Sequence, residues 1–258
     1  MSILDIARNS SDATSGGGAR EFKPPREGVA LLRLCSYIEL GKYKTEWKGK
    51  EKTVYKCMVE FELVHPDHRI LGEDGEFKGY HKIWIRVNKS DNPKSRYMQL
   101  FNCLNHAGAV PVVKGKIPSI GKFLGYPFMG TIYHNPYQEK VYANLDKDGV
   151  YSITAPIAPV FEGGVPTGKY EPVQVPEMHS KPRLFLWESP DMTPAHYHSM
   201  WESIYIEGEK QDGSSKNWIQ EQILSAENIA LPGSQAEKLF LEKGQLDELQ
   251  PEADDLPF

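Results

Sequence analysis

The chain has 258 residues, of which 40% are hydrophobic and 25% are charged, and its formal net charge is -5. This composition is typical of a globular protein that buries a core in one or two domains. No run of about 18 apolar residues is present, so no membrane-spanning helix is expected, and three cysteines without a CxxC spacing argue against a disulfide framework. Since the first residues also lack the basic and apolar regions of a secretory signal, we expect a cytoplasmic protein.

The charge is distributed unevenly along the chain. Residues 20–150 contain 22 Lys and Arg against 15 Asp and Glu, a net charge of +7, whereas residues 151–258 contain 7 against 18, a net charge of -11. The basic part predicts a polyanionic partner. The acidic part is then expected to compete with that polyanion or to serve as an interaction arm.

The chain begins with a predicted flexible arm and continues into strands. Residues 1–24 include a Ser/Gly-rich stretch with little to bury, so we expect them to be flexible. Residues 29–40 alternate with a period of two, which predicts a half-buried strand. One face of this strand carries Leu32, Leu34, Ile38 and Leu40, and the other carries Arg33, Tyr37 and Glu39. Residues 41–52 predict a long hairpin arm, and residues 53–63 alternate again as a second strand.

A third strand, a helix and two further strands are predicted next. Residues 80–90 place apolar side chains on one face and Tyr80, Lys82, Trp84 and Arg86 on the other. Residues 92–108 change to a helical period that ends at Gly108. The fourth and fifth strands are predicted at residues 128–134 and 140–146. This order predicts a mainly β domain over residues 25–155, a five-stranded OB-fold barrel with its helix between strands 3 and 4; a general β-sandwich is the alternative.

The remaining residues predict helical additions and a tail. Residues 156–190 are rich in Pro and Gly, and we expect them to wrap the barrel or to link it to the next part. Residues 191–243 predict a helical extension, in which Thr193 and Pro194 make a favourable helix start. Its helices are predicted at residues 193–206, 214–228 and 234–243. Residues 244–258 are acidic and without period, so we expect them to be disordered.

Aromatic and basic residues alternate on one face of three predicted strands. A nucleic-acid single strand offers phosphates, which bind Lys and Arg, and unpaired bases, which stack on aromatic rings. The residues predicted to stack on bases are Tyr37, Tyr43, Trp47, Tyr80, Trp84 and Tyr142. The residues predicted to meet phosphates are Arg33, Lys42, Lys44, Lys56, Lys82, Arg86 and Lys140. Alternatively, such rings cover the barrel or pack under the C-terminal helices.

The sequence contains no evident catalytic constellation. His65, Asp67 and His68 look like metal ligands, but no further set has zinc spacing, and a polar turn is the simpler interpretation. Glu60 and Glu62 can in principle hold a metal, although such a pair is more often a solvated strand face. The phosphate-binding loop, the nucleophile elbow and the HExxH motif are absent from the sequence. We therefore expect no enzymatic activity, no cofactor and no metal site.

The chain ends with an acidic pair and a terminal aromatic residue. These residues are Asp254, Asp255, Leu256, Pro257 and Phe258. Such an ending is typical of a docking peptide, in which the ring fills a pocket and basic residues bind the carboxylates; a solvated acidic tail is the alternative. The ending resembles the D-D-I-P-F tip of bacterial single-stranded DNA-binding proteins, with Leu256 in place of isoleucine. The body, about residues 25–155, resembles the bacteriophage type of this family in architecture.

The resemblance implies how the tail works. Pro257 and Phe258 would occupy a hydrophobic pocket on partner proteins, while Asp254, Asp255 and the terminal carboxylate would meet a basic rim. In the family such tails recruit replication, recombination and repair proteins to coated single strands, and they can also lie on the protein's own DNA groove. The tail here is only moderately acidic, which favours recruitment of a phage's own enzymes over recruitment of host proteins.

The sequence thus predicts a protein that coats single-stranded DNA, in the host cytoplasm if it is phage-encoded, with RNA and duplex DNA as weaker ligands. It predicts no membrane partner and leaves the oligomeric state open. Two alternatives remain at this point. One is an assembly or scaffold protein with a docking tail, and the other is a metal-dependent nucleic-acid-processing enzyme.

Overall fold

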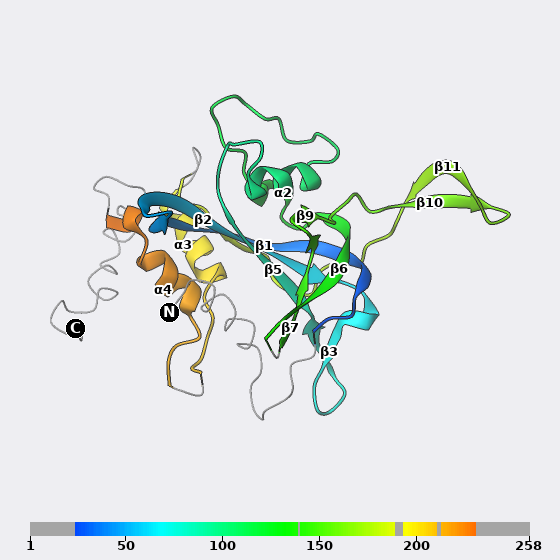
Figure 1. The fold of residues 1–258 in the computed structure, drawn as a ribbon. Coiled ribbons are helices and arrows are strands. Elements are labelled where there is room, and N and C mark those ends of the chain that lie inside the picture. Colours follow the sequence, from blue (N-terminus) through cyan, green and yellow to red (C-terminus); the bar gives the residue numbers. More distant parts are fainter. Residues whose placement is uncertain (1–23, 139, 189–192, 211–212, 231–258) are drawn as a thin grey trace.

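The computed structural model describes residues 24–138, 140–188, 193–210 and 213–230 (Figure 1). Its centre is a mainly β body built on one mixed sheet. The strands of this sheet are β1 (Gly28–Trp47), β2 (Lys50–Leu63), β5 (Lys82–Asn88), β6 (Pro127–Tyr137), β7 (Lys140–Asn144) and β12 (Arg183–Phe185). The order is β5-β2-β1-β6-β7, and β12 pairs in parallel with β1. The mainly β fold class is therefore confirmed.

The sheet does not close into a barrel. Its path ends at β5 on one side and at β7 on the other, and no ladder joins these two strands in the part of the chain that the structure describes. A strand is present at each of the five predicted positions, residues 29–40, 53–63, 80–90, 128–134 and 140–146, although β1 continues to Trp47 and β5 begins only at Lys82. The predicted helix also lies where expected, between the third and fourth of them.

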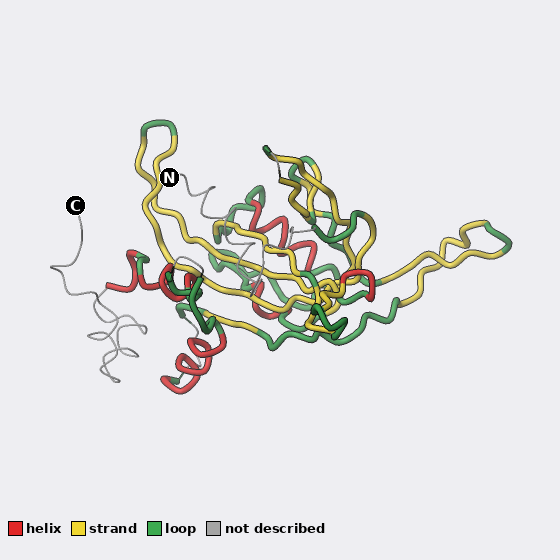
Figure 2. The backbone as a smooth tube through the Cα atoms, turned by 90° about the horizontal axis from the view of Figure 1, so that it is seen from below, coloured by secondary structure: helices red, strands yellow, loops and turns green. Residues whose placement is uncertain are grey.

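Three small hairpins extend from this sheet. They are β3 (Arg69–Leu71) with β4 (Phe77–Tyr80), β8 (Asp146–Lys147) with β9 (Val150–Tyr151), and β10 (Ile157–Glu162) with β11 (Val165–Pro172). Residues 156–190 are therefore more structured than a Pro/Gly-rich connection, since they contain the β10–β11 hairpin and β12. In both views the β10–β11 hairpin and the tip of the β1–β2 hairpin project from opposite ends of the molecule (Figures 1 and 2).

The α-helices of the described residues are α2 (Arg96–Leu104), α3 (Pro194–Ser203) and α4 (Trp218–Leu224), with 3-10 turns η2 (Pro66–His68), η3 (Ile120–Phe123) and η4 (Glu227–Ala230). The first two begin at side-chain caps. Ser95 caps α2, and Thr193 forms a capping box with His196 at the start of α3, which satisfies backbone N–H groups that the first turn leaves unpaired. No helix among the described residues is long and apolar enough to cross a membrane.

Two hydrophobic cores lie on opposite faces of the β1–β2 pair. The first core packs under α2 and η3 and contains Leu32, Leu34, Phe61, Phe101 and Phe128. The second core packs under α3, α4 and β12 and contains Ile38, Leu40, Met58, Phe185 and Trp201. Burying each such side chain contributes about 1.5–3 kcal/mol. The described part of the helical extension is thus fixed to the sheet by its own core.

Two bulges in β1 explain how one strand serves both cores. The ladder with β2 shifts between Leu34 and Ser36 and again between Glu39 and Gly41. Each extra residue moves the following side chains to the other face of the sheet. Leu32 and Leu34 therefore face the first core, while Ile38 and Leu40 face the second. The prediction that these four side chains share one face was wrong, because the bulge after Leu34 reverses the alternation.

Candidate nucleic-acid interface

The predicted cationic and aromatic residues of β2 and β5 do share one surface. Opposite residues of an antiparallel pair point to the same face. Lys82, Trp84 and Arg86 of β5 lie opposite Glu62, Glu60 and Met58 of β2, respectively. Lys56 is two residues from Met58 on β2, so it points to the same face, opposite Gly41 of β1. This face is the one that carries Met58 of the second core, and we call it the outer face. The prediction that Lys82, Trp84 and Arg86 point away from Ile83 and Val87 is confirmed, because these two lie in the first core.

Lys56 and Arg86 form a cationic pair without an acidic partner. Neither side chain makes an ion pair with any residue that the structure describes, and the Nη2 atom of Arg86 is buried without a hydrogen-bond acceptor. Burial lowers the pKa of Lys56, and the neighbouring Arg86 charge lowers it further. Burial likewise lowers the pKa of Arg86. A half-buried cation without a counter-charge is costly, so this place on the sheet favours an anion.

Aromatic rings flank the cationic pair. The Nζ atom of Lys56 lies 4.3 Å from the centre of the Tyr43 ring, and the Arg86 guanidinium lies 5.1 Å from the centre of the Trp218 ring. Trp84 lies next to Trp218, with ring centres 5.9 Å apart, and retains 38% of its surface exposed. We call Tyr43, Lys56, Trp84, Arg86 and Trp218 the cation–aromatic cluster. It places two cations beside three aromatic rings.

The C-terminal part of the chain completes this cluster and partly covers it. The hydroxyl of Tyr43 donates to the carbonyl of Gln222 in α4, and the guanidinium of Arg183 in β12 lies 5.7 Å from the Trp84 ring centre. The alternative interpretation, in which the rings pack under the C-terminal helices, is thus partly correct: Tyr43 and Trp84 both contact α4 with part of their side chains. Sequence reasoning missed Trp218 and Arg183. Trp218 lies within the helix predicted at residues 214–228, and a local helical pattern gives no sign of the cation beside the ring.

Lys82 lies on the outer face but already has an acidic partner. Its Nζ atom is 3.7 Å from Oε2 of Glu60, and Nη1 of Arg183 is 4.0 Å from the same oxygen. Glu60 is 1% exposed, and burial raises its pKa although both cations oppose that shift. Glu62 is buried as well and accepts a hydrogen bond from the backbone N–H of Ser180 at 3.1 Å. The expectation that Glu60 and Glu62 form a solvated strand face is wrong.

Tyr37 and Arg33 are structural residues and are not available to a ligand. Tyr37 lies between the two bulges of β1, so its ring points into the first core and is fully buried. Its hydroxyl lies 3.1 Å from the Tyr97 hydroxyl and donates to the Glu39 carboxylate, also at 3.1 Å. Arg33 donates at 2.8 Å to the carbonyls of Gly125, Val175 and Pro176. Arg33 therefore fastens the segment after β11 to the sheet. Both predictions for the interface are corrected accordingly.

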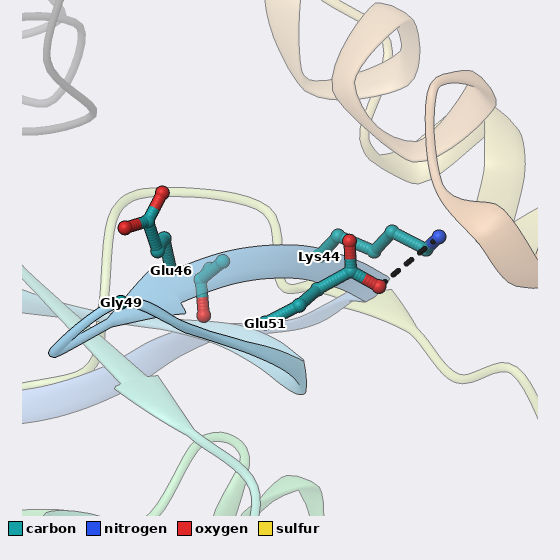
Figure 3. Close-up of a pocket in the computed structure, with 5 residues that line it drawn as sticks. Lys44, Glu46, Gly49 and Glu51 are labelled. Atoms are coloured by element: carbon teal, nitrogen blue, oxygen red, sulfur yellow. Dashed lines mark ion pairs between the residues drawn. The ribbon is translucent and has the colours of Figure 1, made fainter.

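The β1–β2 hairpin divides its predicted residues between two faces. The second bulge returns Tyr43 and Trp47 to the outer face, and Trp47 is 69% exposed near the tip with Lys48 Nζ 5.9 Å from its ring centre. Lys42 and Lys44 alternate with them and point to the opposite face. Lys44 lines a shallow open depression with Thr45, Glu46, Gly49 and Glu51, and its Nζ atom pairs with Glu51 at 3.2 Å (Figure 3). The acidic groups there offset its charge.

The remaining predicted residues lie on other hairpins. Tyr142 and Lys140 pair with Asn135 and Tyr137 across the β6–β7 hairpin, so they share a face of that hairpin. Tyr80 ends β4, in a separate two-stranded sheet, and its ring packs 4.9 Å from that of Phe77. The prediction of one continuous strand over residues 80–90 is therefore wrong at its start, because β5 begins at Lys82.

The histidine cluster of the loop after β2 is a turn. The Nδ1 atom of His65 accepts from the backbone N–H of Asp67 at the start of η2, and His68 is buried. Burial lowers the pKa of His68. Within the described residues, no three His, Cys, Asp or Glu side chains are arranged to hold a metal ion.

Three parts of the sequence prediction fall wholly or almost wholly beyond the described residues. These are the docking tail at residues 244–258, including Asp254 to Phe258, the helix predicted at residues 234–243, and the arm at residues 1–24, which is described only from residue 24. Comparison with known proteins gives no family for the chain. No protein-family model matches it, and no curated protein sequence matches it either.

Proposed function

We propose that this chain is a single-stranded DNA-binding protein whose body is an open variant of the OB fold. The strand order supports the fold proposal: three strands, a helix and two strands follow one another, and the first strand pairs with the second and the fourth, as in an OB barrel. The observation that carries the functional proposal is the cationic pair of Lys56 and Arg86, which lacks an acidic partner among the described residues and is flanked by three aromatic rings.

The chemistry of the cluster suits a single strand better than a duplex. A phosphate placed at Lys56 and Arg86 would supply the missing negative charge, and the charge-assisted hydrogen bonds would offset the burial of both cations. Bases adjacent to that phosphate can stack on the exposed part of Trp84 and, further along the same face, on Trp47. Each stacked base contributes about 1–3 kcal/mol and demands an unpaired strand.

In this proposal the protein acts by stoichiometric coating, without catalysis. The basic part of the chain, with its net charge of +7 over residues 20–150, attracts the strand. The acidic tail, ending in Phe258, recruits replication, recombination and repair proteins to the coated strand and lies on the groove when no strand is bound. The tail function rests on its resemblance to the family and on charge alone.

Anisotropy of a fluorescent oligo-dT across a salt series tests the proposal. The full chain should bind tightly, with affinity that falls steeply as salt rises, since neutralised phosphates release counterions. The Lys56→Ala/Arg86→Gln variant should lose at least tenfold in affinity. The matched control is Lys114→Ala/Lys116→Ala, which removes two exposed charges from a loop outside the cluster and should lose less than threefold.

The decisive comparison is with an anionic polymer that has no bases. If the chain binds oligo-dT no more tightly than a sulfated polysaccharide of similar charge, the cluster provides no stacking and the proposal fails. Equal losses in the cluster variant and the loop control would also contradict it, because binding would then depend on net charge alone.

A further inference from the structure

The β10–β11 hairpin has one face that is entirely apolar. The register pairs Ile157 with Pro172, Pro159 with Tyr170, and Phe161 with Pro166. Antiparallel partners point to the same face, and so do residues two apart on a strand. Between the Pro159–Tyr170 pair and the Phe161–Pro166 pair, β10 advances by two residues and β11 by four. Both steps are even, so the two pairs point to the same face of the hairpin. We call these six residues the apolar hairpin face.

All six side chains of the apolar hairpin face are exposed. Ile157, Phe161 and Tyr170 are 45%, 56% and 64% exposed, and the three prolines are exposed too. The half-buried residues of the hairpin, Ala158, Val160 and Thr167, belong to the opposite face, which also carries the charged Glu162, Lys169 and Glu171. The hairpin is therefore amphipathic, with its apolar side turned to solvent.

No described element packs on this face. Both strands make their extensive contacts only with each other, and Figures 1 and 2 show the hairpin projecting alone from the body at the end remote from α3 and α4. An isolated two-stranded hairpin is at best marginally stable in water. An ordered arm with an uncovered apolar face indicates an interaction surface.

The prolines determine how a partner can approach. Pro159 in β10 and Pro166 and Pro172 in β11 lack the N–H that an added strand would need, and proline on an edge strand blocks strand addition. The partner must therefore cover the face with side chains. Since the face carries no Lys or Arg, it lacks the cations that a nucleic-acid backbone requires.

We propose that the occupant is the same face of a second copy of this chain. An apolar face without charged residues can pack on an identical face without burying an unpaired charge, and twofold contacts between identical surfaces are the commonest way in which chains associate. The face exposes on the order of 500 Å² per copy, so a pair would bury about 1,000 Å², the lower limit of a specific interface. An interface of this small size predicts a weak dimer that forms and dissociates with concentration.

Because the arms project away from both cores, two chains joined in this way keep their cation–aromatic clusters apart and uncovered. The self-association goes beyond the proposed strand binding and does not depend on it. It must therefore be measured without nucleic acid, so that failure of either proposal is seen separately.

Sedimentation velocity of the full chain, from about 1 to about 100 μM, measures the association across the range where weak dimers form. The wild-type chain should shift from monomer to dimer. Phe161→Ser/Tyr170→Ser should weaken the dimer at least tenfold, while the control Val165→Ser, which changes a 66% exposed side chain on the other face, should leave it unchanged. Both variants should bind oligo-dT as the wild type does.

A photo-crosslinker tests which surface is occupied. With p-benzoylphenylalanine in place of Tyr170, a mixture of isotope-labelled and unlabelled chains should give adducts between copies that map to residues 157–172. A wild-type chain that stays monomeric throughout the series would overturn the proposal. So would a double variant that associates normally, or adducts that map elsewhere on the second copy.

Discussion

Trp218 of α4 packs against Trp84 of β5, with ring centres 5.9 Å apart and ring planes inclined by 46°. About half of the chain separates the two residues, and their contact joins the helical extension to the outer face of the sheet. The Arg86 guanidinium lies 5.1 Å from the centre of the same Trp218 ring. Trp218 thus belongs both to the packing of the extension and to the cluster that we propose to bind the strand.

Replacing Trp218 with Ala should lower the free energy of unfolding by about 2–3 kcal/mol, because the loss of a large half-buried ring leaves a cavity between α4 and β5. Trp47→Ala is the matched control, since its ring is 69% exposed and its removal should change the stability by less than about 0.5 kcal/mol. Urea unfolding followed by circular dichroism measures both. Equal stabilities for the two variants would show that α4 does not pack on the sheet as described.

Tyr37→Phe should reduce stability by about 1–2 kcal/mol without affecting strand binding. The variant removes a buried hydroxyl and leaves Tyr97 and Glu39 each without one partner. The ring itself stays in the first core and never contacts a ligand. Unfolding and oligo-dT anisotropy are measured on the same preparation, and a fivefold loss of affinity in a fully folded variant would contradict the buried placement of Tyr37.

The bulges of β1 show why the strands were predictable and their faces were not. Alternation identified residues 29–40 as a strand, and β1 does run through them. A bulge at Cys35 adds one residue without changing the pattern of residue types, so the faces assigned to Ile38 and Tyr37 were reversed beyond it. Lys82, Trp84 and Arg86 were assigned correctly because β5 has no irregularity in its ladder with β2.

Contacts between distant parts of the chain set the other limit. Arg33 was expected to meet phosphates, but backbone carbonyls more than 90 residues away bind its guanidinium. Trp218 and Arg183 join the cluster through the packing of α4 and β12, which no local pattern encodes. The β10–β11 hairpin was missed for a different reason. The three prolines of residues 157–172 suggested a linker, although in the structure these prolines and the apolar residues line one face of the hairpin.

The stability contributed by Glu60 should depend on pH. Its folded-state pKa is raised above the ordinary value of 4.5, mainly by burial. Below pH 4.5 the Glu60 carboxyl is protonated in both the folded and the unfolded state. Above that pH the carboxyl ionises in the unfolded state while it stays protonated in the folded state. The free energy of unfolding therefore falls as pH rises from the ordinary pKa to the folded-state pKa. Glu60→Gln removes this fall.

Urea unfolding of the wild type and Glu60→Gln, from acidic to neutral pH, measures the effect. The two should be equally stable at the acidic end, and the variant should become the more stable as pH rises. Glu51→Gln, on the exposed hairpin, is the matched control and should follow the wild-type pH dependence, apart from a small effect of its ion pair with Lys44. A variant that is less stable than the wild type at neutral pH would show that the Lys82 and Arg183 charges outweigh the burial of Glu60.

Gly41 should be required where β1 meets the C-terminal segment. Its φ of +112° is one that L side chains rarely adopt, and a Cβ there would lie 2.5 Å from Cβ of Ala226 and 2.8 Å from Oδ1 of Asn228. That Oδ1 accepts the backbone N–H of Lys42 at 2.8 Å, so the clash would also displace a hydrogen bond that fixes η4 to the strand. Gly41→Ala should therefore cost more than about 2 kcal/mol and loosen the segment after α4.

The control for Gly41 is Gly49→Ala in the hairpin turn. Its φ of +73° is also positive, but no atom lies within 4 Å of the added Cβ, so only the backbone strain of about 1–2 kcal/mol is expected. Hydrogen exchange separates the two effects: Gly41→Ala should speed exchange at Ala226 and Ile229, whereas Gly49→Ala should not. If both variants lose the same stability and keep the protection of residues 226–229, then close packing against β1 is not what holds this segment in place.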